Sequence, residues 1–194
     1  MGKLIFNYGV MGSSKTAEAL MCRFNYIQKG FNVLLLKPSI DNRFEKDEQP
    51  KLISRIGISA DCIKFNQNDD LFVLFVKQNL NKKVDIVIID ECQFATSKQI
   101  EQLKQIAHNI PVICYGLLTN FKTELFEGSK RLVELADILK NISSVCKCGN
   151  DANVNARLID GKIVTSGDEI LIGAEENYES MCYWCYTKKL NEQK

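Results

Sequence analysis

Residues 9–16, Gly-Val-Met-Gly-Ser-Ser-Lys-Thr, match the phosphate-binding loop G-x-x-x-x-G-K-[ST] at all but one position. In such a loop, backbone N–H groups at the start of a helix converge on a phosphate, and a lysine adds positive charge. Gly9 would open the turn, Lys15 would reach the phosphates and Thr16 would offer a hydroxyl to Mg²⁺. Ser14 replaces the second glycine and keeps its N–H, so it fits unless the backbone needs a positive φ or excludes a Cβ. We predict a working phosphate loop with one altered position.

Two acidic residues follow the apolar run 84–89 and supply the other half of a nucleotide site. An aspartate at the carboxyl end of such a strand lies beside the phosphate loop, where it can hold Mg²⁺ or its waters. We therefore assign Mg²⁺ to Thr16 and Asp90, and Glu91 is available as a general base. The alternative, acids that only solubilise a strand end, does not explain why both motifs occur in order. The predicted ATP site comprises Gly9, Val10, Met11, Gly12, Ser13, Ser14, Lys15, Thr16, Asp90, Glu91, Cys92 and Gln93.

The eight cysteines fall into two groups. Four lie singly in apolar runs and are interpreted as small buried hydrophobes, namely Cys22, Cys62, Cys92 and Cys114. The other four form a C-x-C and a C-x-x-C pair, which suits a structural Zn²⁺ held by four thiolates. A redox dithiol is the alternative for the second pair, but no thioredoxin-like strand pattern lies beside it. The predicted zinc ligands are Cys146, Cys148, Cys182 and Cys185.

Apolar runs alternate with helix-like stretches in the order of a parallel sheet with crossover helices. One helix is expected to begin at Thr16, and another is expected over 97–109 with Ser97 as its N-cap. The polar segment 38–54 is expected to be a surface loop. Strands are expected at 3–8, 32–37, 62–65, 84–89 and 111–116, with a possible sixth at 138–144.

The character of the sequence changes at the first cysteine pair. Residues 1–145 are expected to form a P-loop α/β domain that binds ATP. In 146–194, two cysteine pairs bracket short β-like pieces at 152–159 and 161–167, so we expect a small zinc-binding β domain there.

The composition narrows the class of protein. The 194 residues are 45% hydrophobic and 25% charged, which supports a packed core and excludes a disordered chain. The net charge of +1 gives no electrostatic surplus for nucleic acid or an anionic membrane. Apolar runs are far shorter than the roughly 20 residues that cross a bilayer, and the N-terminus lacks the regions of a signal peptide. We expect a cytoplasmic protein with neither membrane nor nucleic acid as a partner.

Five stretches match one known family in order and spacing. They are YGVMGSSKT at 8–16, DNR at 41–43, DECQF at 90–94, YGLLTNFKTELFEGS at 115–129 and IGAEENYESMCYWCY at 172–186. On these motifs the chain resembles the cellular-type (type II) thymidine kinases over nearly its full length. The resemblance implies a RecA-like P-loop sheet flanked by helices, and a C-terminal zinc-binding domain whose lasso loop covers the base.

The same resemblance implies that ATP phosphorylates the 5′-hydroxyl of thymidine in deoxynucleotide salvage. Carried over by position, Glu91 is the general base, and Arg43 offsets charge in the transition state. Asp41 and Arg43 match the family's D-x-R motif near the reacting groups. The alternative for Arg43 is an exposed side chain in a polar loop.

The family's thymine pocket carries over to residues on several segments. A nucleobase is flat and apolar on both faces, so apolar walls supply affinity while backbone groups of the lasso read its edge. For each apolar residue, ordinary core packing is the alternative. The substrate-binding residues implied in this way are Met11, Asp41, Phe94, Leu117, Phe121, Phe126, Asn155, Leu171, Ile172, Gly173 and Tyr178.

Three positions depart from the family pattern. Ser14 replaces a glycine, Val10 stands where proline or a small residue is common, and Asn155 falls where threonine commonly touches the base. These changes bear on rate and nucleoside preference more than on reaction class. The resemblance further implies a homotetramer, with feedback inhibition by dTTP.

The main alternative function is a P-loop ATPase whose zinc appendage binds nucleic acid or a protein. It predicts a basic, aromatic surface on the appendage. Residues 146–181 carry few basic side chains, Lys147, Arg157 and Lys162, against several acids. The sequence therefore favours the kinase.

Overall fold

The computed structural model describes residues 2–41, 49–168 and 177–193. Its larger part contains a six-stranded sheet in the order β5-β2-β6-β7-β1-β8, and every neighbouring pair in it is parallel. The six predicted strands are confirmed, including the possible sixth. Their bounds are β1 (Leu4–Tyr8), β2 (Val33–Pro38), β5 (Ile63–Phe65), β6 (Ile86–Ile89), β7 (Val112–Gly116) and β8 (Ile138–Asn141).

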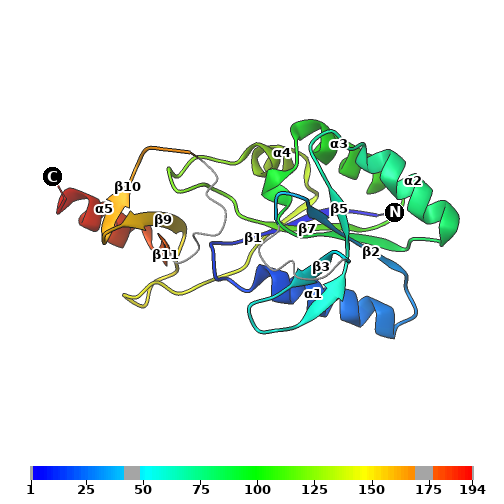
Figure 1. The fold of residues 1–194 in the computed structure, drawn as a ribbon, viewed down its shortest axis with the longest axis horizontal. Coiled ribbons are helices and arrows are strands. Elements are labelled where there is room, and N and C mark those ends of the chain that lie inside the picture. Colours follow the sequence, from blue (N-terminus) through cyan, green and yellow to red (C-terminus); the bar gives the residue numbers. More distant parts are fainter. Residues whose placement is uncertain (1, 42–48, 169–176, 194) are drawn as a thin grey trace.

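Helices cover both faces of this sheet, with α1 on one side and α2, α3 and α4 on the other (Figure 1). In β6, Ile86 and Ile88 enter the core beneath α1, whereas Val87 and Ile89 enter the core shared with α3. All four side chains are fully buried, as expected for a central strand of a parallel sheet. The helix bounds are α1 (Lys15–Gln28), α2 (Leu71–Asn81), α3 (Ser97–Ile106) and α4 (Glu127–Leu135), with a single 3₁₀ turn, η1 (Cys92–Phe94), before α3.

The N-cap predicted for α3 was wrong by one residue. Thr96, not Ser97, caps the helix, and the helix ends at Ile106. The Thr96 hydroxyl accepts a hydrogen bond from the Gln99 N–H, and the Gln99 side-chain oxygen accepts one from the Thr96 N–H. This capping box satisfies two N–H groups at once, which explains why the helix begins there.

Some elements are absent from the sequence-based prediction. Part of the expected loop 38–54 forms β3 (Lys51–Ile53), which pairs with β4 (Ser59–Asp61) in an antiparallel hairpin. Helices α2, α4 and α5 (Tyr183–Asn191) were also not predicted. In α2 the apolar residues do not keep to one face, and several are exposed, so its periodicity is weak. Within the described ranges, each helix is too short or too polar to cross a bilayer.

A second, smaller sheet has the order β10-β9-β11, and both of its pairings are antiparallel. It carries α5 and lies beyond the carboxyl ends of the parallel strands (Figure 1). The predicted β-like pieces are confirmed as β9 and β10. Ligands of open α/β sheets bind at the carboxyl ends of the strands, so the small sheet lies beside the expected site. The strand bounds are β9 (Val154–Ile159), β10 (Lys162–Val164) and β11 (Tyr178–Met181).

Candidate active site

The loop between β1 and α1 closes around the side chain of Lys15. The Lys15 ammonium donates a hydrogen bond to the Val10 carbonyl at 2.7 Å and lies 3.4 Å from the Ser13 hydroxyl. Packing requires glycine at Gly9, since a Cβ there would lie 2.5 Å from Ser13 Oγ and 2.6 Å from the Ile142 carbonyl oxygen. Because α1 begins at Lys15, the positive charge of this lysine lies at the N-terminal end of the helix, where the helix dipole also favours anions.

Ser14 has a left-handed backbone conformation, with φ of 65° and ψ of 17°. This is the case in which the sequence argument expected glycine to be preferred, and for a serine it costs about 1 kcal/mol. The side chain is exposed, and the Ser14 carbonyl accepts the Glu18 N–H at 2.9 Å. The departure from the motif therefore places a strained residue at the start of α1 without blocking the helix.

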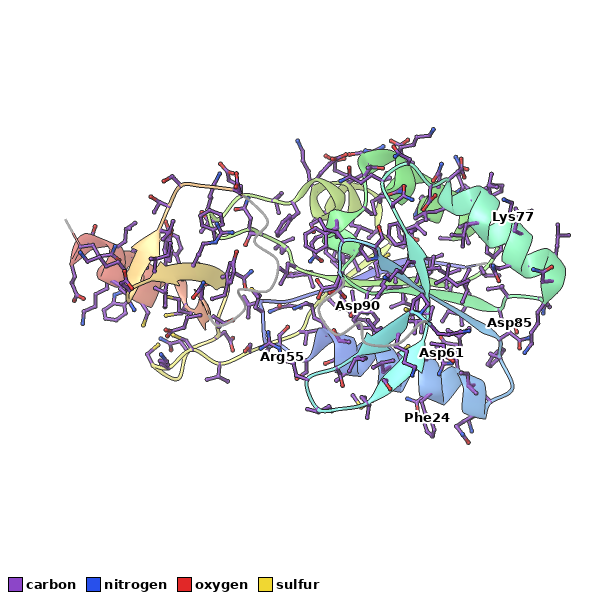
Figure 2. The ribbon with its side chains drawn as sticks, viewed as in Figure 1. Phe24, Arg55, Asp61, Lys77, Asp85 and Asp90 are labelled. Atoms are coloured by element: carbon purple, nitrogen blue, oxygen red, sulfur yellow. The ribbon has the colours of Figure 1, made fainter. Side chains whose placement is uncertain are left out.

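The Thr16 hydroxyl donates a hydrogen bond to Oδ2 of Asp90 at 2.7 Å, which joins the two predicted Mg²⁺ ligands. Figure 2 shows Asp90 at the end of the large sheet nearest the small sheet, with Asp85 at the opposite end of β6. Burial and the negative charge of Glu91 together raise the pKa of Asp90 to about 7, while the Thr16 hydrogen bond opposes the shift.

The second oxygen of Asp90, Oδ1, is buried and has no hydrogen-bond partner among the residues that the structure describes. A buried acceptor without a partner is costly, because it has lost water and gained nothing in exchange. Carboxylate and hydroxyl oxygens are ligands that Mg²⁺ accepts, and one or two such groups beside phosphates suffice for it. The Asp90–Thr16 pair therefore fits a divalent cation bound together with a nucleotide.

Glu91 has a positive φ of 51°, and its carboxylate is oriented by a neighbour. The side-chain nitrogen of Gln93 donates to Glu91 Oε2 at 2.6 Å, and the Gln93 side-chain oxygen accepts the Leu117 N–H at 3.0 Å. Gln93 thereby links the candidate base to the segment after β7. Cys92, which we expected at the ATP site, lies in the hydrophobic core with 0% exposure, so its side chain is closed to a ligand.

Two residues predicted to contact the base are engaged elsewhere. Asn155 is buried: its side-chain oxygen accepts the Met11 N–H at 2.7 Å, and its side-chain nitrogen donates to the Thr119 carbonyl at 3.0 Å. Phe121 is 1% exposed, and its ring is covered by the guanidinium of Arg157 at 3.7 Å. In this structure both side chains are buried and make their contacts within the protein.

Arg157 lies beside several predicted site residues, but the sequence did not indicate a role for it. It was considered only as one of the few basic side chains in residues 146–181. Its Nε donates to the Tyr178 hydroxyl at 2.8 Å, and its Nη1 donates to the Asp168 carbonyl at 2.8 Å. The guanidinium also stacks on the Phe121 ring, so it holds the predicted sugar-site residue Tyr178 beside the predicted base wall. The available signal was alternation, because Asn155 and Arg157 are the polar positions of an otherwise apolar strand.

The rings of Phe94 and Phe126 meet edge to face, with centroids 5.9 Å apart. Both rings line a pocket of about 560 Å³ at the carboxyl ends of β2 and β5. Met11 and Leu117 are half-buried, and Asp41 is buried with the Lys37 ammonium 3.9 Å from its carboxylate. The remaining predicted residues, Arg43, Leu171, Ile172 and Gly173, lie outside the described residues.

The four predicted zinc ligands come together, and their sulfur atoms all lie within 4.8 Å of one another. A tetrahedral Zn²⁺ with bonds of about 2.3 Å places its sulfurs about 3.8 Å apart, and Cys148 Sγ lies 3.6 Å from Cys182 Sγ. Backbone N–H groups of Cys148 and Cys182 lower the pKa of the Cys146 thiol to about 6. Hydrogen bonds with the thiols of Cys148 and Cys182 raise the pKa of Cys185 to about 12. The cluster therefore contains one thiol that ionises readily and one that does so reluctantly, and a bound metal ion would favour the thiolate form of its ligands.

The sequence comparisons with a family model and with curated proteins agree on one family. The family model described as thymidine kinase matches residues 2–186. The chain is 39% identical to a thymidine kinase of Shewanella oneidensis over 94% of this chain and 95% of that protein. It is also 39% identical to thymidine kinases of Photorhabdus laumondii, over 99% and 96% of the two chains, and of Pasteurella multocida, over 98% and 99%.

The left-handed conformation at position 14 leads to a stability prediction. We expect Ser14→Val to lower the unfolding free energy by roughly 1–2 kcal/mol relative to Ser14→Gly, because a β-branched side chain is poorly tolerated at positive φ. Denaturant unfolding of the two variants measures the difference. Equal stabilities would contradict the backbone conformation described for Ser14.

Proposed function

The chain belongs to the thymidine kinase family, and on this premise we propose that it transfers the γ-phosphoryl group of ATP to the 5′-hydroxyl of thymidine. The observation that carries the proposal is the hydrogen bond between Thr16 and the buried carboxylate of Asp90, with the buried Lys15 next to Thr16 in the phosphate loop. Lys15 and the loop N–H groups hold the phosphates, and Thr16 and Asp90 hold Mg²⁺. A Mg²⁺ ion held by these residues would supply positive charge to offset the negative charge of the phosphates.

Glu91 is proposed as the general base. The 5′-oxygen of thymidine attacks the γ-phosphorus, the bond from that phosphorus to ADP breaks, and the hydroxyl proton passes to the Glu91 carboxylate. The hydrogen bond from Gln93 to Oε2 orients this carboxylate. Glu91 directly follows Asp90 in the chain, and its negative charge contributes to the raised pKa of Asp90.

For the nucleoside we propose that Phe94 and Phe126 wall the thymine and that Tyr178 lies near the sugar. The edge-to-face contact of the two rings supports this role. The family resemblance supports the roles of Arg43 in transition-state stabilisation and of the lasso residues 171–173 in reading the base. Because dTTP joins a thymine to a triphosphate, it matches both halves of the site, and we propose it as a feedback inhibitor.

The cysteine cluster is proposed to hold a structural Zn²⁺. Four thiolates complete the coordination of the ion and leave no position for a substrate. The cluster joins the start of the small sheet to the start of α5, so metal would tie both ends of this unit together.

A homotetramer is proposed from two apolar faces on opposite sides of the large sheet. On α1, Met21, Phe24 and Ile27 are 50%, 59% and 40% exposed, and Figure 2 shows Phe24 pointing away from the sheet. On α2, Val73 and Leu80 are 47% and 80% exposed. Two distinct self-complementary faces generate a closed tetramer of two-fold symmetry.

The kinase proposal is tested by phosphorylation with ATP and Mg²⁺ across a nucleoside panel. We expect phosphorylated thymidine as the product, and Glu91→Gln should lower kcat by roughly 10² or more while ATP still binds. The matched control is Glu192→Gln, which changes an exposed carboxylate at the end of α5. ATP turnover that depends on added nucleic acid, with no nucleoside phosphorylated, would instead support the ATPase alternative.

The zinc proposal is tested by metal analysis of the purified protein. We expect one Zn²⁺ per chain, and Cys148→Ser should abolish it, because an exposed ligand is removed without disturbing a core. Cys62→Ser, outside the cluster, should keep its metal. Unchanged zinc in the Cys148 variant would rule out the tetrathiolate site.

The tetramer proposal is tested by sedimentation velocity. Phe24→Glu and Leu80→Glu should each yield dimers, and the double variant should yield monomers, because a charge is costly to bury in an apolar interface. Ile159→Glu, at an apolar position on β9 that is about as exposed as Phe24 (57% against 59%), serves as the control. A wild-type protein that sediments as a monomer would refute the assembly.

A further inference from the structure

Both backbone groups of Met11, in the phosphate loop, are held by side chains of the small sheet. The Met11 N–H donates to the side-chain oxygen of Asn155 at 2.7 Å, and the Met11 carbonyl accepts from the Ser180 hydroxyl at 2.5 Å. Asn155 on β9 and Ser180 on β11 are directly opposite each other in the antiparallel pair, so they project to the same face. The two strands therefore present one donor and one acceptor to a single residue of the loop.

The preceding residue, Val10, is inserted into the core of the small sheet. Its side chain is 6% exposed and belongs to the same apolar cluster as Val154, Met181 and the cysteines Cys146 and Cys182. The Val10 carbonyl in turn accepts the hydrogen bond from the Lys15 ammonium at 2.7 Å. A continuous series of contacts thus runs from the cysteine cluster through Val10 to the lysine of the phosphate loop.

Asn155 reaches a third segment as well. Its side-chain nitrogen donates to the Thr119 carbonyl, between Leu117 and Phe121 in the loop after β7. With 3% of its surface exposed, the Asn155 side chain has both its oxygen and its nitrogen engaged with backbone groups. Replacing it would remove the partners of these part-buried backbone groups, which costs more than a lost contact at a fully exposed surface.

We propose that Ser180 and Asn155 are positioning residues that hold the phosphate loop in the conformation that binds ATP, so that the small domain sets ATP affinity and not only nucleoside affinity. The inference rests on the proposed ATP site but not on the identity of the nucleoside. Neither side chain needs to touch ATP, because each acts through the backbone of Met11. Pre-organising a loop raises affinity by removing the cost of ordering it on binding.

Ser180 provides the sharper test, since its side chain makes one described contact with the loop and is not fully buried. The variants Ser180→Thr and Ser180→Val have nearly the same shape and both suit a β-strand, but only the threonine keeps a hydroxyl. ATP binding is measured by calorimetry without nucleoside, and KM values for ATP and thymidine are measured in the phosphorylation assay. Ser166→Ala removes an exposed hydroxyl of the same domain as a control.

We expect Ser180→Val to raise the Kd and KM for ATP about threefold to tenfold, the range for one lost hydrogen bond, with kcat changing less than twofold. Ser180→Thr should restore ATP affinity, and Asn155→Ala should raise both KM values because it frees both loops. Equal ATP affinity in the valine and threonine variants would overturn the inference. If the wild-type protein itself bound no ATP, the proposed function would fail, and calorimetry distinguishes that result from failure of the positioning role.

Discussion

The hydrogen bond between Thr16 and Asp90 is the constraint on which the site depends. It ties the first turn of α1 to the end of β6, so the phosphate loop and the acidic strand end form one unit. Burying a carboxylate is unfavourable, and the nearby charge of Glu91 adds to the penalty, as the raised pKa of Asp90 shows. A divalent cation held by this pair would favour the ionised form of the carboxylate, because it would supply opposite charge beside it.

A second pair of hydrogen bonds connects Glu91, next to Asp90, to the segment that follows β7. Gln93 holds the carboxylate of Glu91 with its nitrogen and the backbone of Leu117 with its oxygen. The space for it exists because β7 ends in Gly116, where a Cβ would lie 2.6 Å from the Gln93 side-chain oxygen. One side-chain amide therefore links the candidate base to the backbone of Leu117, which we propose as a wall of the nucleoside pocket. The glycine at 116 is needed for that link.

Local patterns made much of the fold predictable from the sequence. The parallel strands are apolar runs, and the phosphate loop and the cysteine pairs are defined by short spacings, so each was recognisable within about ten residues. The roles of Asn155 and Arg157 were not recognisable in this way. Asn155 contacts Met11 and Thr119, which lie 144 and 36 residues away in the chain, and no local pattern specifies such partners.

Backbone conformation was the other limit of the sequence argument. A serine and a glycine both supply an N–H group, and only the tertiary structure shows that position 14 has a positive φ. The short helices α4 and α5 have nine residues each, too few for a periodicity that distinguishes a helix from a loop. Their positions are set by packing on neighbouring elements.

The hydrogen bond from Ser180 to Met11 joins residues 169 positions apart in the sequence. A contact of such high sequence separation is reached only after the intervening chain has been closed into a large loop, which costs conformational entropy. Most contacts of the parallel sheet involve shorter separations and can form earlier in folding. The final shape of the phosphate loop therefore depends on one of the last tertiary contacts that we expect to form.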